Sequence, residues 1–490
     1  MKLGIKSKRI VVFLAMMSAI VLLGKAQSNL VIYHINEQFN SSAFNPAFLT
    51  SQKKFNFSIF PLAGMNLGTN NLPVIKDVMT QFLEGNQTTD DFKGVFNSLV
   101  KQDLFFLNYK ANLLNLGYNS AFASFNFRIS ENVLLMTNFK GELSGFLSSQ
   151  DFKNLVIGQS QLFAAQELHY REYSFGFAKE IIKKRLSVGV RAKIYFGKSL
   201  LFSEVSGKII ERADTIFTQI TGPMRLSIPA NPNFDGGYLK DLNLATNFDI
   251  GDYITNAKNI GTGVDLGFKY KITPEIEISA SAIDLGRIKW KQNINTLIFN
   301  EDFPFPKNNI GPKLDENGAP MFDENGELIL IKLNDKPLAD TISFRLTVDE
   351  KAFSKPLPTT FYAGIRYQVN PALYFGMVDR FITTKELKYN SLLLSVNYQI
   401  NKRFTISTGC SIIGNTYKNL PFALLYNWES GQSFIGSDNV LSFLIPSGSG
   451  YSGITFGTCF YLFRKKTKDT RQLEYLPYYQ PKKSKLISKL

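Results

Sequence analysis

"LSVGVRAKIYFGK", residues 186–198, shows the clearest two-residue alternation in the chain. Every second side chain from Leu186 to Phe196 is apolar, and the side chains between them are small, polar or charged, with Arg191 and Lys193 among them. Because successive side chains of an extended chain point to opposite faces, this stretch predicts a strand with one apolar and one polar face. About ten residues of such alternation are typical of a strand that crosses a membrane within a β-barrel.

The same alternation returns along the chain. It is clear at residues 264–272, 361–369, 392–400 and 404–412, and again in the closing stretch "GITFGTCFYLF", residues 453–463. In that closing stretch we expect one face to meet lipid, namely Ile454, Phe456, Phe460 and Leu462. A soluble β-sandwich alternates in the same way, so the pattern by itself leaves both architectures open.

The lengths of the connections separate these two architectures. Short connections are predicted at 129–132, 182–185, 273–275, 370–371, 401–402 and 429–432, and long segments lie at 61–110, 144–167, 198–261 and 288–357. Short and long connections alternate, as they do in outer-membrane barrels with short periplasmic turns and long external loops. The fold class predicted is therefore all-β, a transmembrane antiparallel β-barrel of about 14 strands with short helices in external loops.

The predicted strands follow from these boundaries. They lie near 53–60, 113–128, 132–143, 168–181, 186–197, 262–272, 276–287, 358–369, 372–380, 390–400, 403–413, 418–428, 432–445 and 452–463. In the second of them the apolar parity switches near Asn119 and Ser120. A β-bulge at that point explains the switch, whereas a hairpin there would change the strand count.

The two ends of the chain differ from its body. Residues 1–26 combine a basic start, an apolar run and a small-x-small site at Gly24–Ala26, which predicts a signal peptide. An uncleaved anchor helix is the alternative, but the apolar run is shorter than the ~20 residues that span a bilayer. We assign 27–52 to a plug-like segment, 53–463 to the barrel and 464–490 to a basic periplasmic tail.

The formal charge of +15 is concentrated at these ends. Removing +5 for residues 1–26 and +7 for residues 464–490 leaves +3 for the body, which is not the charge pattern of a nucleic-acid-binding protein. The expected partners are outer-membrane lipids, the outer-membrane assembly machinery, and a periplasmic or surface protein that docks on the basic tail or the loops.

Residues that carry enzyme chemistry are scarce. The only histidines are His34 and His169, and neither stands near a nucleophile motif. Cys410 and Cys459 lack the spacing of a zinc site, and their strand parities place them on opposite faces, so we expect them to stay unpaired. We predict no enzyme activity, no catalytic residues, no metal and no cofactor.

The polar faces of the predicted strands carry charge into the lumen. The residues placed there are Lys140, Glu142, Glu172, Arg191, Lys193, Asp265, Lys269, Lys271, Glu277 and Arg366. One interpretation is that these charges neutralise one another and stiffen a closed barrel. The other is a polar conduit, or a pocket for the head group of an amphipathic ligand.

The loops carry two further features. The segment 61–110 shows apolar stripes at helical spacing within 74–83 and 88–100, which predict two amphipathic helices. "DENG" occurs at 315–318 and again at 323–326, which predicts two turns of a β-ribbon rather than a calcium site.

Several motifs resemble known barrel families. Residues 42–48, with Asn45, Pro46 and Ala47, resemble the Asn-Pro-Ala motif near the N-terminus of FadL-type fatty-acid transporter barrels and of PorP/SprF-type barrels attached to type IX secretion. Residues 170–173, 259–263 leading to 284–286, and 437–439 are similar to a Bacteroidota outer-membrane barrel family of unassigned function. The closing stretch resembles the C-terminal β-signal that the outer-membrane assembly machinery reads, at Thr455, Gly457, Phe460 and Leu462.

The resemblance implies a 14-strand barrel with a plugged lumen and names no ligand, although residues 27–53 are short for a FadL-type hatch. We therefore expect an outer-membrane protein of a Gram-negative bacterium, a transporter or pore for a small or hydrophobic ligand. The alternative is a structural or scaffolding barrel, associated with secretion, that docks periplasmic or cell-surface partners.

Overall fold

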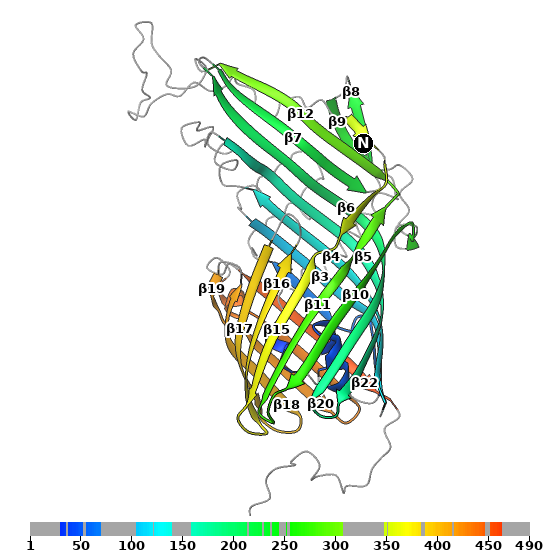
Figure 1. Cartoon of the computed structure of the whole chain (residues 1–490), viewed down its shortest axis with the longest axis vertical. Helices are drawn as coiled ribbons and strands as arrows, with labels where there is room; N and C mark the ends of the chain where they lie inside the picture. The colour runs from blue at the N-terminus through cyan, green and yellow to red at the C-terminus, as the bar shows by residue number, and fades with distance from the viewer. Residues whose placement is uncertain are drawn as a thin grey trace, which may run out of the picture.

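The computed structural model describes residues 30–35, 38–51, 55–69, 104–120, 122–139, 158–212, 215–227, 230–235, 238–244, 251, 255–306, 347–349, 351–383, 388–413, 416–445 and 451–462. These residues form a closed antiparallel barrel of 14 strands, which confirms the predicted fold class (Figure 1). The predicted signal peptide, loop helices at 74–83 and 88–100, DENG turns and basic tail lie outside the described residues.

The barrel strands pair with their neighbours along the chain. β1 (Phe55–Ile59) and β2 (Met65–Thr69) share one position in the wall, because both pair with β22 on one side and β3 on the other. The other strands of the wall are β3 (Leu104–Asn119), β4 (Ser124–Phe139), β5 (Gly158–Ile182), β6 (Leu186–Arg212), β10 (Asn259–Lys271), β11 (Ile276–Trp290), β14 (Phe353–Pro356) with β15 (Thr359–Gln368), β16 (Leu373–Thr383), β17 (Lys388–Gln399), β18 (Phe404–Ile413), β19 (Thr416–Asn419) with β20 (Phe422–Trp428), β21 (Gly431–Ser437) and β22 (Ser452–Tyr461).

One wall of the barrel is much taller than the other (Figure 1). β5 and β6 run for 25 and 27 residues, and beyond the barrel they continue as a sheet with β7 (Thr215–Ser227), β12 (Ile294–Pro306) and β13 (Thr347–Asp349). β8 (Ala230–Asp235) and β9 (Tyr238–Leu244) form a separate hairpin. Parts of the predicted long loops 144–167, 198–261 and 288–357 are thus strands. In these extended segments the backbone N–H and C=O groups form hydrogen bonds with those of neighbouring strands.

The predicted strands 113–128 and 132–143 are wrong. The chain turns at 120–123, where the Ser120 hydroxyl accepts hydrogen bonds from the backbone N–H groups of Phe122 and Ala123, and it runs straight through the predicted turn at 129–132. This hairpin causes the parity switch, and the bulge of β3 lies earlier, between Asn112 and Leu114. The strand count is unchanged, because one turn replaces another.

The outward face of the wall is apolar and the inward face is polar. On β6, Val190 is 39% and Ile194 is 49% exposed, whereas Arg191 and Lys193 are buried inside. This inversion suits a barrel whose outer solvent is lipid. Among the residues described, no helix is long and apolar enough to cross a membrane.

A segment that we call the plug, residues 30–51, of which 30–35 and 38–51 are described, has its described residues inside the barrel, where Figure 1 shows its short helices in dark blue. It contains three 3₁₀ turns, η1 (Leu30–Ile32), η2 (Ser41–Ala43) and η3 (Pro46–Ser51). η1 contacts β17, β18, β20 and β21, whereas η3 contacts β5, β6 and β10 on the other side of the lumen. The segment that looked short for a hatch is thus long enough to reach across the barrel.

Candidate functional site

The Asn-Pro-Ala motif anchors the plug to the barrel wall. Asn45 is fully buried, and its side-chain amide donates hydrogen bonds to the carbonyl oxygens of Phe268 (2.9 Å) and Ala280 (3.1 Å). Its Oδ1 accepts from the backbone N–H of Ala47 at 2.9 Å. A Cβ at Gly267 would collide with Asn45, so the glycine of β10 lets the motif approach the wall. One side chain therefore fixes the motif to β10 and β11.

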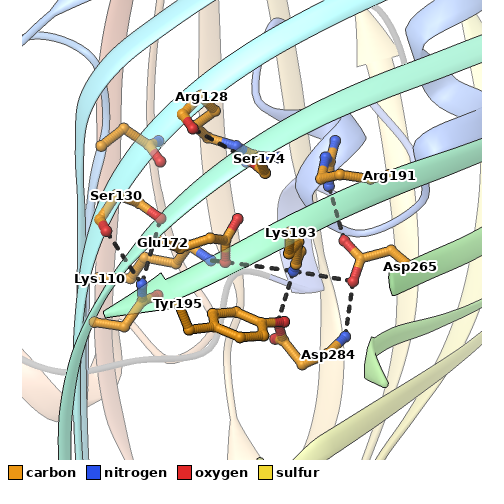
Figure 2. Close-up of polar contacts among 12 residues, drawn as sticks. Lys110, Arg128, Ser130, Glu172, Ser174, Arg191, Lys193, Tyr195, Asp265 and Asp284 are labelled. Atoms are coloured by element: carbon orange, nitrogen blue, oxygen red, sulfur yellow. Dashed lines mark hydrogen bonds and ion pairs between the residues drawn. The ribbon is translucent and has the colours of Figure 1, made fainter. Parts of the chain in front are cut away.

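Six charged side chains on the inner face of the wall form a group that we call the lumen charge cluster. They are Lys110, Glu172, Arg191, Lys193, Asp265 and Asp284 (Figure 2). Lys193 is at its centre, with Nζ 2.6 Å from Asp284, 2.9 Å from Asp265 and 3.3 Å from Glu172. Lys110 is 3.7 Å from Glu172. Three cations thus face three carboxylates, and the cluster is neutral as a whole.

Arg191 joins the cluster to the plug. Its Nη1 donates to Asp265 at 3.2 Å, and its Nη2 donates to the backbone carbonyl of Ser42 at 2.7 Å. Burial of a charge is costly unless the charge is paired. The Ser42 carbonyl of the plug therefore helps to stabilise the buried guanidinium of the wall, together with Asp265.

A local irregularity brings Asp284 into the cluster. The register between β10 and β11 shifts between Val264 and Leu266, and Asp284 has a φ of +62°, a region that Asp tolerates better than most residues. The Asp284 N–H donates to Asp265 Oδ1 at 2.8 Å, and the Tyr195 hydroxyl donates to Asp284 at 3.0 Å. A Cβ at Gly263 would overlap the Tyr195 ring. The motifs at 259–263 and 284–286 therefore build this bulge.

The other predicted lumen residues are more dispersed. Lys269 donates to Ser51 Oγ at 2.7 Å at the end of the plug, and Arg366 donates to Gln368 at 2.8 Å. Lys271 is exposed at the end of β10, and Glu277 is half-buried. Lys140 and Glu142 lie outside the described residues.

The buried or half-buried charges on the inner face that the strand predictions do not place there include Lys110, Arg128, Asp284 and Arg380. Lys110 lies in a predicted loop, and Arg128 lies in a predicted strand whose bounds are wrong. Arg380 shares the parity of Tyr374 and Gly376, so the alternation of its strand was a sufficient signal.

A cavity of about 120 Å³ lies between the plug and the ends of the strands nearest the long connections. The plug contributes Ala43 and Phe44 to its floor. Its apolar walls include Phe106, Leu134, Leu168 and Ile382, and its polar walls include Lys110, Tyr170, Asp284, Tyr362 and Arg380. The cavity therefore combines an apolar surface with cations.

The N-terminal end of the plug is held by one carboxylate. Asp438 accepts hydrogen bonds from the backbone N–H groups of Leu30 (2.9 Å) and Val31 (2.7 Å). Burial raises the pKa of Asp438 to about 6, against the lowering effect of these two N–H groups. Close by on the plug, burial and the charge of Arg366 lower the pKa of His34 to about 3. One basic and one acidic titratable side chain thus lie at this end of the plug.

The remaining predicted positions lie on β18 and β22. Thr455 and Gly457 are buried toward the lumen, while Phe460 is half-buried and Leu462 is exposed on the outward face. Cys410 is exposed and Cys459 is buried, and they are unpaired, as predicted. In the described part of the chain no three His, Cys, Asp or Glu side chains are grouped to hold a metal.

Comparison with solved structures finds barrels of similar course. They include the toluene transporter TbuX of Ralstonia pickettii (12% identity, covering 86% of this chain and 93% of that chain, TM-score 0.41) and the monoaromatic hydrocarbon channel CymD (10%, 87% and 92%, TM-score 0.37). A Pseudomonas aeruginosa FadL homologue matches at 10% identity, 86% and 92% coverage and a TM-score of 0.36. At these values the likeness says nothing about a ligand of this chain.

No curated protein matches the chain. A family model described as "Family of unknown function (DUF5723)" matches residues 46–438, a range that begins at Pro46 of the plug motif and ends at Asp438 of the N-terminal contact. The match spans most of the 490 residues. The chain therefore belongs to this family of unknown function, DUF5723.

Proposed function

We propose that the protein resides in the outer membrane of a Gram-negative bacterium and admits a small, partly apolar ligand into its lumen, with the plug as the gate. The observation that carries this proposal is the cavity that lies directly on the plug and is walled by both apolar and cationic side chains. The apolar outward face of the barrel supports the membrane location, and the short turns would lie on the periplasmic side.

Passage through the barrel requires the plug to move, because its residues are buried between opposite walls. Apart from the continuity of the chain toward β1, the contacts between plug and wall among the described residues are non-covalent. They are chiefly hydrogen bonds and a cluster of apolar side chains that includes Tyr33, Phe44 and Tyr362. The gate can therefore open without breaking a covalent bond.

A reversible cross-link tests the gate. A Cβ built at Gly436 lies 3.2 Å from Cγ1 of Val31, so V31C and G436C are close enough for a disulfide. The pair is placed in a C410S/C459A background, and the efflux of phenyl glucoside from proteoliposomes is measured with and without reductant. We expect oxidation to suppress efflux and reduction to restore it, while V31C alone is insensitive to oxidation.

Efflux that is equal in the oxidised and reduced states would show that the plug is not a gate. Efflux no faster than from empty liposomes in both states would reject transport. The second outcome would favour a scaffolding barrel that docks a partner through its loops or basic tail.

A further inference from the structure

Arg380 is a buried cation that forms no ion pair with a carboxylate among the described residues. It lies on the inner face of β16, is only 5% exposed, and lines the cavity. Its Nη2 donates to Ser391 Oγ at 3.0 Å, and Tyr362 is also hydrogen-bonded to it. Its Nε has no hydrogen-bond partner in the part of the chain that the structure describes.

The carboxylates around Arg380 are engaged or directed elsewhere. Burial raises the pKa of Asp438 and the charge of Arg380 lowers it, so the two groups interact electrostatically. The two oxygens of Asp438, however, accept hydrogen bonds from the backbone N–H groups of Leu30 and Val31. Asp379, the next residue in sequence, falls on the opposite face of β16. Asp284 shares the cavity wall but is engaged by Lys193 and Tyr195. No carboxylate of the described residues forms an ion pair with Arg380, whereas every cation of the lumen charge cluster has one. A buried cation in this state is costly unless an anion joins it.

The other walls of the cavity indicate what kind of anion fits. Lys110 adds a second cation, and its one ion pair among the described residues is the 3.7 Å contact with Glu172. Phe106, Leu134 and Leu168 supply an apolar surface. The volume of about 120 Å³ is close to that of an apolar cavity that takes up one benzene molecule.

We infer that this cavity binds a small organic monoanion, with its charged group on Arg380 and an apolar body of about one aromatic ring against Phe106, Leu134 and Leu168. The route by which this anion reaches the cavity rests on the proposed function. Arg380 supplies a planar fork of N–H donors, and a carboxylate matches that fork in geometry. Lys110 contributes to the potential and is not required to touch the ligand.

Arg128 offers a matched control. It is a second buried guanidinium, 2% exposed, on the inner face of β4, and its Nε also has no hydrogen-bond partner within the described residues. It does not line the cavity. A loss of charge at Arg128 therefore changes the net charge of the lumen as R380M does, without touching the proposed site.

Calorimetry on the purified full-length protein in detergent tests the inference, with benzoate as the anion and benzyl alcohol as its neutral counterpart. We expect benzoate to bind at least about tenfold more tightly than benzyl alcohol. R380M should weaken benzoate binding by about 30-fold or more, R380K by less, and R128M by no more than about threefold. Heat-modifiable migration on gels verifies that each variant is folded.

Three results would overturn the inference: benzyl alcohol binding as tightly as benzoate, R128M weakening binding as much as R380M, or no benzoate binding by the wild type. If R380M does not fold, R380K and K110M replace it in the test. Each of them must then weaken the binding of benzoate more than the binding of benzyl alcohol. The outcome is separable from that of the gate experiment. Benzoate binding that depends on Arg380, together with absent efflux, would reject transport and leave the anion site in place.

Discussion

The two ends of the plug are held in different ways. At the motif end, Asn45 and Arg191 form hydrogen bonds that join plug and wall in both directions, from the plug amide to β10 and β11 and from the wall guanidinium to the Ser42 carbonyl. At the N-terminal end, apolar packing around Leu30, Val31 and Tyr33 is supplemented by the Asp438 carboxylate. Both ends pack in the same apolar cluster, but the motif end adds hydrogen bonds of a neutral amide and a guanidinium, whereas the N-terminal end adds those of a carboxylate.

This difference has a consequence for the response to pH. The motif end, Asn45–Ser51, contains no titratable side chain, whereas His34 and Asp438 both lie at the N-terminal end. Burial shifts their pKa values in opposite senses, that of His34 downward and that of Asp438 upward. The N-terminal end is therefore the part of the plug whose docking depends on protonation.

The largest effect is expected at the motif end from R191M. The variant leaves Asp265 with one cation fewer and the Ser42 carbonyl without its donor, so we expect a loss of about 3–5 kcal/mol in the free energy of unfolding. Urea titration in detergent measures the loss. K271M, at an exposed position, serves as the control and should change it by less than about 0.5 kcal/mol. A small effect of R191M would mean that the motif end is held by packing alone.

N45A should cost somewhat less, about 2–4 kcal/mol, because it removes the three hydrogen bonds of a fully buried side chain. T50V removes hydrogen bonds from a half-buried hydroxyl of the same segment and should cost about 1 kcal/mol. Hydrogen exchange of residues 41–51 should rise strongly in N45A alone. Equal exchange in both variants would contradict the anchoring role of the motif.

Acidification should weaken docking through His34. Its pKa in the folded protein is lowered to about 3, so the stability it contributes is present above its ordinary pKa of 6.5 and is lost as pH falls toward 3. Between pH 7 and pH 4 we expect the contribution of His34 to fall by about 3 kcal/mol, measured as the difference between the wild type and H34F in urea titrations at each pH. H34F, which cannot take up a proton, should flatten this dependence, and an unchanged slope in H34F would assign it to another group.

Asp438 should give the smallest effect, with the opposite sign. Its folded pKa is raised to about 6, so the stability it contributes is fully present below its ordinary pKa of 3.8 and is lost as pH rises through about 6. In the H34F background, lowering the pH from 7 to 5 should therefore stabilise the protein by about 1 kcal/mol. D438N should abolish this gain. A gain that persists in H34F/D438N would show that Asp438 is not its source.

Local patterns in the sequence determined the architecture. The alternation at 186–198 places Arg191 and Lys193 inside and Val190 and Ile194 outside. Successive side chains of a strand point to opposite faces, and this holds independently of the rest of the chain. The spacing of turns was adequate to predict the number of strands. The parity switch near Asn119 was ambiguous, since a bulge and a hairpin reverse the faces equally, and only pairing with β3 decides that β4 begins at Ser124.

Tertiary structure alone decided which charges meet and which do not. Lys193 reaches Asp284 because a register shift between β10 and β11 turns the aspartate inward. Among the described residues Arg380 forms no ion pair, because Asp379 faces the other way, Asp284 is engaged by Lys193, and Asp438 accepts from the backbone of the plug. The burial of a plug of this length likewise follows from the width of the closed barrel and from the inward glycines of β6 and β10. Alternation is a property of neighbours in sequence, whereas these distances depend on the register of strands that lie far apart along the chain.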